Sequence, residues 1–416
     1  MKKLLLVLAC GASLLSNKLY AQEDPNVVTT AVPFLLISPD ARAGGMADQG
    51  VATLPDANSI MWNTAKLPFI NKQSGLSLSY SPWLENLVGD VNIATLAGYT
   101  KLNSKSAVTF NLRYFSLGDV TFRQEADDKG YTFGPNEFNL TGGYSMKLSR
   151  RLSAGINIKY IRSQLTDGAV SDGGFADSQP GNAVATDISA FYKSAQFDLS
   201  GKDAYLTGGI NIANIGGKIK YSDSQDQSQF LPAHMRLGAG LHVDIDNYNS
   251  MSFSFETMKL LVPTQPIYET IDGERVITSG KDPNVGVIEG IFQSFSDSPD
   301  GETEFQEFTF SLGAEYWYQN QFAFRAGYFY EDELKGNRQY ATLGAGLKLE
   351  MASLDVSYLI PTTSQAFSPL QGTLRFSINV GLDAFASDKE EEETPAKKKS
   401  SKKKNRGGED KKEESN

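Results

Sequence analysis

The stretch that most constrains the fold is residues 371–382, in which apolar and polar side chains alternate without interruption. One parity carries Leu374, Phe376, Ile378, Val380 and Leu382, and the other carries Thr373, Arg375, Ser377, Asn379 and Gly381. A period of two predicts a β-strand with one apolar and one polar face. The arginine in the polar face indicates that this face meets water. Strands of this kind form outer-membrane barrels, which are apolar toward lipid and polar toward the lumen.

The same alternation recurs along the chain. About fourteen segments show it, most of them near ten residues long: 76–83, 91–101, 105–115, 137–147, 151–163, 184–195, 203–213, 233–244, 250–260, 307–317, 321–331, 339–350, 352–360 and 372–382. This length suits a tilted strand that crosses a bilayer. Mean hydropathy is −0.31, as expected when lipid-facing and lumen-facing residues alternate. The pattern predicts an all-β transmembrane protein, an antiparallel outer-membrane β-barrel of about fourteen strands.

The lengths of the connections support a barrel over a soluble β-sandwich. After the third, fifth, seventh and ninth predicted strands the loops have roughly 20, 20, 19 and 46 residues, whereas most of the others have roughly one to five. Long loops on one side and short turns on the other are the outer-membrane arrangement. We therefore expect a multi-pass barrel with its long loops extracellular. With an even strand number, both termini are expected in the periplasm.

The two ends of the chain have compositions unlike the barrel. Residues 1–21, with two lysines before an apolar run, have the features of a secretory signal peptide. The only cysteine, Cys10, loosely resembles a lipoprotein site, but the favoured cleavage after Ala21 leaves a mature chain without cysteine. Residues 386–416 are block-charged and lack aromatic residues, which predicts a disordered periplasmic tail. Its lysine run, 397–404, either solubilises the protein or contacts the cell wall or partner proteins.

Between these ends we expect an N-terminal plug or cap, residues 22–74, followed by the barrel, residues 75–385. Residues 33–69 do not alternate, are partly glycine-rich and contain Asp56, which can cap a short helix. The segment either packs on the barrel as a cap or lies in its mouth as a plug. The residues singled out as its motif are Asp40, Arg42, Gly44, Gly45, Asp56, Asn58, Trp62 and Asn63.

Residues that point into the predicted lumen carry mixed charge. Arg113, Arg236, His242 and Arg375 are the lumen candidates singled out, and Glu256, Glu315 and Asp355 share the lumen parity. Such charges either select solutes in a pore or pair with one another and with the plug, because buried charges must be paired or wet. We favour pairing. The net charge of −10 argues against nucleic-acid binding.

No strong catalytic or metal-binding pattern is present in the sequence. The two histidines, His234 and His242, would lie about 26 Å apart along one strand, too far to share a metal ion. His242 near Asp244 is all that the sequence offers for a Ser-His-acid esterase in the barrel wall. We therefore predict no enzyme activity, no catalytic residues, no metal site and no cofactor.

The longest loop, residues 261–306, is too apolar to be only a solvated spacer. It either folds over the barrel or presents apolar side chains to a partner. The residues predicted to contact a partner or cargo are Ile267, Tyr268, Ile288, Ile291, Phe292 and Phe295. The loop at residues 165–183 is the secondary candidate for contacts with a partner.

The N-terminal segment also resembles a known family. Residues 43–69 are similar to the corresponding region of FadL-like outer-membrane proteins, with Asp56 to Ser59 followed by Asn63, Ala65 and Leu67. Thr64 stands where that family usually has proline. Residues 34–53, FLLISPDARAGGMADQGVAT, resemble more closely the PorV and PorQ group of the type IX secretion system.

The resemblance implies a fourteen-stranded FadL-like barrel with an N-terminal plug and no enzyme activity. It implies docking at the lateral opening of the SprA translocon barrel. There the protein would take the C-terminal signal domain of a secreted protein and carry it to the PorU-containing attachment complex. Outer-membrane lipid and lipopolysaccharide would surround it. Two alternatives stay open: a FadL-like channel for hydrophobic small molecules, and a lipid A deacylase.

Overall fold

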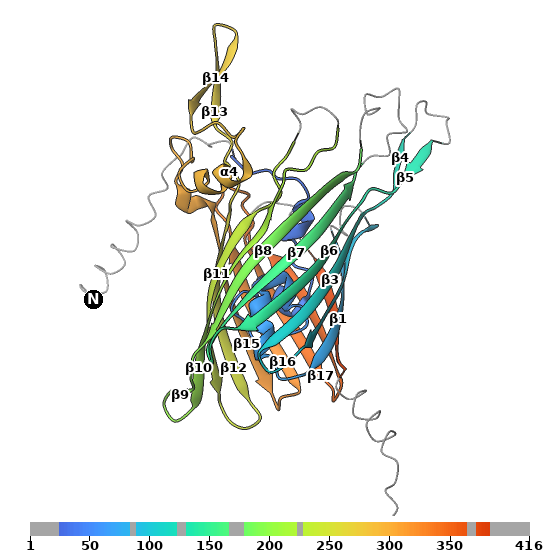
Figure 1. The fold of residues 1–416 in the computed structure, drawn as a ribbon, viewed down its shortest axis with the longest axis vertical. Coiled ribbons are helices and arrows are strands. Elements are labelled where there is room, and N and C mark those ends of the chain that lie inside the picture. The colour runs from blue at the N-terminus through green and yellow to red at the C-terminus, as the bar shows by residue number, and fades with distance from the viewer. Residues whose placement is uncertain are drawn as a thin grey trace, which may run out of the picture.

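The computed structural model describes residues 25–83, 89–122, 130–165, 179–222, 228–363 and 372–382. The predicted signal peptide, residues 1–21, and the predicted charged tail, residues 386–416, lie outside the described residues. The described chain forms a tilted-strand barrel with part of its own N-terminal region inside (Figure 1).

The barrel wall has fourteen antiparallel strands, and this confirms the predicted fold. They are β1 (Ser74–Pro82), β2 (Val91–Lys101), β3 (Ser106–Leu117), β6 (Asn136–Lys147), β7 (Leu152–Gln164), β8 (Gly181–Lys193), β10 (Asp203–Gly216), β11 (His234–Asp244), β12 (Ser250–Leu260), β15 (Phe308–Tyr318), β16 (Phe322–Tyr330), β17 (Tyr340–Lys348), β18 (Ala352–Pro361) and β19 (Leu374–Gly381). Each pairs with the next, and β19 returns to β1, where Leu78 lies opposite Ile378. This last pairing closes the sheet, so the wall strands described here have both edges paired.

The two faces of the wall are inverted relative to a soluble protein. Large apolar side chains such as Leu78, Ile158 and Val184 point outward and are exposed. The alternate positions, such as Asn111 and Asp187, point inward and are buried. This arrangement suits a barrel in lipid, with apolar side chains outside and polar ones within. Within the described ranges, no helix is long and apolar enough to cross a membrane.

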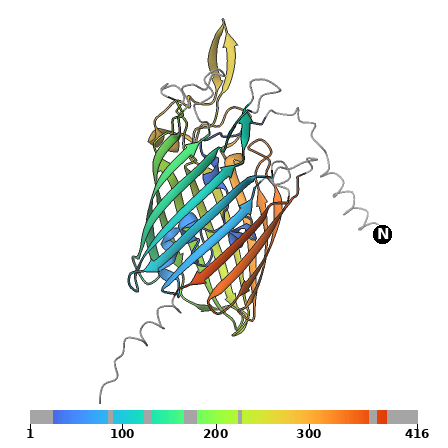
Figure 2. The same ribbon diagram turned by 90° about the vertical axis from the view of Figure 1, so that its right-hand side faces the viewer.

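The connections separate by length, as the sequence predicts (Figures 1 and 2). Short turns join the strands at one end, which we call the turn end, where β9 (Phe197–Asp198) briefly extends the sheet. The long connections gather at the opposite loop end. They contain β4 (Val120–Phe122) and β5 (Tyr131–Phe133), and the longest contains β13 (Ile267–Ile271), β14 (Glu274–Ser279), helix α4 (Val287–Gln293) and the 3-10 helix η5 (Glu304–Glu307).

The N-terminal segment lies inside the barrel, so of the two arrangements left open by the sequence the structure has the plug (Figure 2). It contains four short helical pieces: η2 (Pro33–Leu36), α2 (Ala41–Gly44), α3 (Ser59–Trp62) and η3 (Thr64–Phe69). The single helix expected after Asp56 is instead divided into α3 and η3. The break falls at Asn63, whose backbone is extended and whose side chain caps Ala65 N–H. We call residues 31–73 the plug.

The plug runs from the loop end to the turn end. Asn26 N–H donates to Leu334 O and Ala31 N–H donates to Phe230 O, both in loop-end connections. Phe34 then packs among buried side chains in the loop-end part of the wall, including Ile93, Phe115 and Ile161. The first described residues therefore lie at the loop end, while Gly381 closes β19 at the turn end. The chain termini themselves lie outside the described residues, so their expected periplasmic location stays a prediction.

Candidate functional site

Glycines on the inner face of the wall make room for the plug. A β-carbon on Gly209 would lie 2.1 Å from Val51 O, and one on Gly327 would lie 2.5 Å from Ala47 N. In both cases the neighbour is plug backbone, which cannot rotate away as a side chain can. The plug therefore packs directly against the strands at these positions, since glycine permits close backbone approach.

A chain of buried and half-buried charges joins the plug to the wall. Arg42 donates from Nη2 to Glu315 Oε1 over 2.9 Å and from Nη1 to Asp56 Oδ2 over 2.7 Å. Glu315 also accepts from Arg325 Nε over 2.7 Å, and Arg325 reaches Asp355 over 2.8 Å. Glu315 is 1% exposed and lies between two guanidinium groups. Each charge in this chain is paired, which buried charges require.

Two further ion pairs fix the same stretch of plug. Arg375 on β19 donates to Asp48 Oδ1 over 2.8 Å, and Asp48 also accepts from Tyr340 Oη over 2.6 Å. Arg236 on β11 pairs with Glu256 over 2.8 Å. The other oxygen of Glu256 accepts the backbone N–H groups of Gly50 and Val51, each at 2.8 Å. These lumen charges therefore hold the plug in the structure.

The plug-motif residues meet within this packing. Asp40 caps α2 by accepting from Ala43 N–H, and its other oxygen accepts from Trp62 Nε1 at 2.8 Å. Asn63 donates to Val51 O and to Ala190 O of the wall. Asp56 accepts from Asn58 N–H and so holds the turn before α3. The two glycines face the wall closely, because β-carbons there would lie 2.5 Å from Arg375 for Gly44 and 3.0 Å from Gly344 for Gly45.

The lumen histidine, His242, has serine and threonine as its polar partners. Its Nδ1 lies 2.8 Å from Ser252 Oγ, its Nε2 lies 3.1 Å from Thr207 Oγ1, and its ring stacks on Tyr205 at 4.9 Å. Both ring nitrogens have hydroxyl partners, so among the residues that the structure describes no carboxylate orients the imidazole as a Ser-His-acid triad requires. Asp244, the acid suggested by the sequence, lies across the sheet from Asp203 and Ser250.

The longest loop is held to the barrel by a second group of charges, which we call the loop ion-pair cluster. Lys259 at the end of β12 pairs with Glu304 and Glu307, and Lys335 of a neighbouring loop pairs with Glu302 at 2.5 Å and Glu307 at 3.3 Å. Asn26 also donates to Glu302 over 3.1 Å. The cluster joins two loops and the start of the chain into one support at the loop end.

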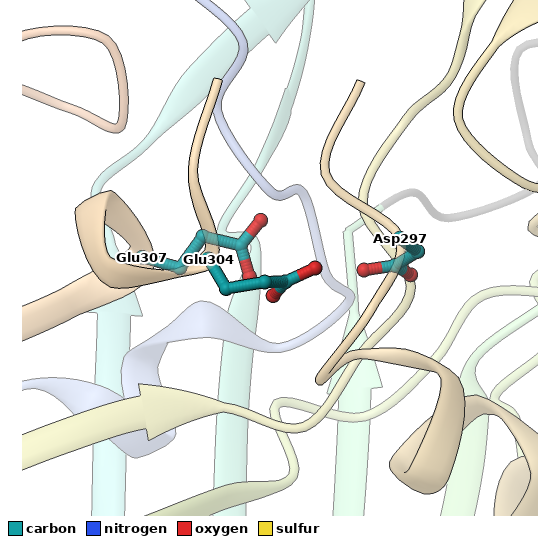
Figure 3. Close-up of side chains that lie close together, drawn as sticks. All are labelled: Asp297, Glu304 and Glu307. Carbon is teal, nitrogen blue, oxygen red and sulfur yellow. The ribbon is translucent and has the colours of Figure 1, made fainter. Parts of the chain in front are cut away.

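Three carboxyl groups in this region lie close enough together to hold a cation (Figure 3). Ligand oxygens of Asp297, Glu304 and Glu307 lie within 4.8 Å of one another. Lys259 already binds both glutamates, so a lysine ammonium supplies positive charge where a metal ion would. Asp297 is instead held by Thr264 N–H at 3.0 Å. We therefore interpret this group as a structural ion-pair site.

Burial raises the pKa of the Asp297 carboxyl from its ordinary 3.8 to about 6. A raised folded-state pKa stabilises the loop at low pH, and this stabilisation is lost as pH rises through about 6. We expect protease to cleave the loop 261–307 several-fold more slowly at pH 5 than at pH 7.5. Asp297→Asn, which stays neutral, should remove most of this difference, and an unchanged pH profile in that variant would contradict the assignment. Limited proteolysis of the detergent-solubilised protein measures it.

An exposed apolar surface lies over the loop ion-pair cluster. Helix α4 turns Ile288 and Phe292 outward, 61% and 73% exposed, and Phe295 just beyond it is 44% exposed. We call these three residues the rim patch. The Phe295 ring lies 5.7 Å from Lys259 Nζ, so the patch rests directly on the loop ion-pair cluster. Residues at i and i+4 share one helix face, which explains why Ile288 and Phe292 present a common surface.

The other predicted contact residues are less available. Ile291 packs inward against Ala233, Leu261 and Val262. Tyr268 is half-buried under the Arg275 guanidinium, which lies 3.9 Å from its ring centroid, and Ile267 is 44% exposed at the start of β13. Phe305 was not among the residues predicted to contact a partner, although it is 68% exposed. Its ring centroid lies 5.4 Å from that of Phe310 on β15, so it extends the outward-facing aromatic side chains of that strand towards the loop end. Its proximity to the first lipid-facing residues of β15 was the available signal.

Comparisons with known proteins identify the family. Residues 20–267 match the family described as type IX secretion system protein PorV. The chain belongs to the PorV family. It is therefore an outer-membrane component of the type IX secretion system, as the resemblance in the N-terminal segment predicts. The comparison with curated protein sequences finds no match.

Among solved structures, this PorV-family barrel is similar to the toluene transporter TodX of Pseudomonas putida, with 11% identity and a TM-score of 0.46 over 81% of this chain and 95% of that one. It is also similar to the toluene transporter TbuX of Ralstonia pickettii, with 11% identity and a TM-score of 0.41 over 83% and 97%. A FadL homologue from Pseudomonas aeruginosa has 14% identity and a TM-score of 0.40 over 85% and 98%.

Proposed function

We propose that this PorV-family barrel is a non-enzymatic carrier in type IX secretion. It binds the C-terminal signal domain of a secreted protein at the SprA translocon and delivers it to the PorU-containing attachment complex. The loop end faces the outside of the cell, and the turn end, where β19 ends at Gly381, faces the periplasm. The first described residues lie at the loop end, so the plug enters the lumen from the outer side in this orientation.

The rim patch is the observation that carries this proposal. Exposed large apolar residues on the wall face lipid, whereas Ile288, Phe292 and Phe295 stand on a loop beyond the strands. An exposed apolar patch on a supported surface favours a protein partner. Its support is the loop ion-pair cluster, which keeps α4 against the barrel and so limits the ordering cost on binding.

The channel alternative has less support. In a channel for hydrophobic molecules the lumen would offer a continuous apolar path. Here the middle of the barrel contains plug backbone. The pair Arg42–Glu315 joins the plug to the wall, and the pair Arg236–Glu256 joins two neighbouring wall strands. The enzyme alternative, a lipid A deacylase, depends on His242, and the hydroxyl partners of its ring nitrogens favour a structural role.

The test is the double substitution Ile288→Ser with Phe292→Ser. Exposed apolar anchors at protein interfaces often contribute 2 kcal/mol or more each, so we expect cargo export to fall about tenfold or further. Export is measured from cargo at the cell surface and in the medium, and partners from gently solubilised membranes. Leu199→Ser, an exposed apolar position at the turn end, is the matched control and should export normally.

Normal export and an unchanged set of partners in the double variant would overturn the proposal. Bound fatty acid without any translocon partner would favour the channel instead. Changed lipid A in a His242→Ala strain with export intact would favour the enzyme.

A further inference from the structure

Arg113 is a buried cation whose hydrogen-bond partners are all neutral carbonyl groups. It lies on β3, points into the lumen and is 5% exposed. Its Nη1 donates to the carbonyl oxygens of Phe34, Leu35 and Ile37 at 3.0, 3.3 and 3.2 Å. Among the residues that the structure describes, no carboxylate forms an ion pair with it, and its Nε has no hydrogen-bond partner. A buried charge without a counter-charge is costly, so this site favours an anion.

A small cavity lies beside this guanidinium. Its volume is about 30 Å³, enough for one or two waters or one monatomic ion. Polar groups that line it include Arg113, Asn139, Thr141, Lys159, His234 and Arg236, and the described part of the chain contributes no carboxylate to the lining. Lys159 and Arg236 already have their own partners, Asp187 at 2.9 Å and Glu256 at 2.8 Å. Arg113 is therefore the lining cation whose charge is left to balance.

The nearby acid of the plug, Asp40, does not fill this role. Its two carboxylate oxygens accept from Ala43 N–H and from Trp62 Nε1. The adjacent Pro39 lines the cavity, but the Asp40 carboxylate does not. Asp40 therefore acts on Arg113 only as a nearby charge, without a direct hydrogen bond or ion pair.

Asn139 supplies a second, independent indication. It lies directly opposite Arg113 on β6 and also lines the cavity. Its Oδ1 is buried without a partner, while its Nδ2 donates to Thr141 Oγ1 at 2.9 Å. Amide oxygen and nitrogen are interchangeable in shape, so the group can be turned over. The Thr141 hydroxyl then donates to Oδ1, and the amide N–H₂ becomes a free donor beside Arg113.

We propose that this cavity binds a chloride-class monatomic anion between Arg113 and Asn139. The anion accepts from the guanidinium and from the turned amide, and it neutralises Arg113 without further rearrangement. Because Arg113 also holds the carbonyl groups of residues 34–37, the anion stabilises the loop-end part of the plug. A monatomic anion fits the cavity volume, whereas gluconate does not.

The experiment uses the full-length protein in detergent at constant ionic strength, in sodium bromide, sodium chloride or sodium gluconate. A ligand that binds only the folded state raises the melting temperature with its concentration. We expect a rise of several degrees in both halides over gluconate, and a bromide anomalous peak beside Arg113 in crystals. Equal melting temperatures in the three salts, or no such peak, would overturn the proposal.

Two variants separate anion binding from general stability. Asn139→Asp places a carboxylate beside Arg113, so it should fold without halide dependence and lose the bromide peak. Arg375→Gln removes a lumen arginine that already pairs with Asp48, so its stability should fall but its halide dependence should persist. Halide dependence that survives in Asn139→Asp, or disappears in Arg375→Gln, would contradict the assignment to Arg113.

Discussion

Gly209→Val is expected to prevent the plug from seating and to open the barrel to ions. A β-carbon at this position would lie 2.1 Å from Val51 O and 2.9 Å from Asn63 Nδ2, inside van der Waals contact. The first neighbour is backbone, and Asn63 is itself bonded to that same carbonyl. Overpacking of this kind commonly costs 1–3 kcal/mol or more, and here the plug must move as a whole. Single-channel conductance in planar bilayers should rise several-fold over the wild-type protein.

The neighbouring glycine is the matched control. Gly208 faces outward, and a β-carbon there meets its nearest heavy atom, Gly238 O, only at 3.9 Å. Valine suits an exposed strand position facing lipid, so Gly208→Val should keep wild-type conductance. Equal conductance in the two variants would show that the inner glycines are not what seats the plug.

The second large effect is expected for Glu315→Ala. This change leaves Arg42 with Asp56 alone and the buried Arg325 with Asp355 alone, so each guanidinium loses one of its two carboxylates. Removing one partner of a buried ion pair typically costs about 3–5 kcal/mol, and the carboxylate that each arginine keeps should place the loss near the lower end of this range. We expect urea unfolding in detergent to shift by this order, and the plug to become sensitive to protease. Glu350→Ala, at an exposed turn-end position, should behave as wild type.

A double substitution tests the physical cause. Arg42→Met with Glu315→Met removes the shared pair from both sides and leaves Arg325 with Asp355 at 2.8 Å. Replacing both partners with apolar groups leaves only the partly exposed Asp56 without Arg42, whereas Glu315→Ala removes one carboxylate from two guanidinium groups, so the double variant should be more stable than Glu315→Ala. A double variant as unstable as the single one would mean that packing, and not charge, determines the loss.

The wall of this protein could be read from its sequence with little error. Observed and predicted strand ends agree within three residues, and residues 91–101 and 250–260 match β2 and β12 at both ends. The reason is that each strand separates lipid from a polar interior, so its side chains must alternate whatever the neighbouring strands are. The sorting of loop lengths was equally visible, because a meander places alternate connections at opposite ends.

The partners inside the lumen could not be read in this way. The polar parity shows that Glu315 and Arg375 avoid lipid, but it does not show which residues they pair with. Glu315 lies 273 residues from Arg42 in the chain, and only barrel closure brings the two together. The same polar parity suits an open pore, so the choice between pore and plug required the structure.

For the candidate partner surface, the sequence by itself determined that the longest loop carries more apolar residues than a solvated connection needs. Only the tertiary structure decided that Ile291 packs inward while Ile288 and Phe292 point outward. A seven-residue helix such as α4 has no fixed orientation of its own. Its exposed face is set by what lies beneath it, here the side chains of Ala233, Leu261 and Val262 and the ion pairs of Lys259. Local alternation is a property of the chain, whereas contacts between distant segments exist only once the barrel has closed.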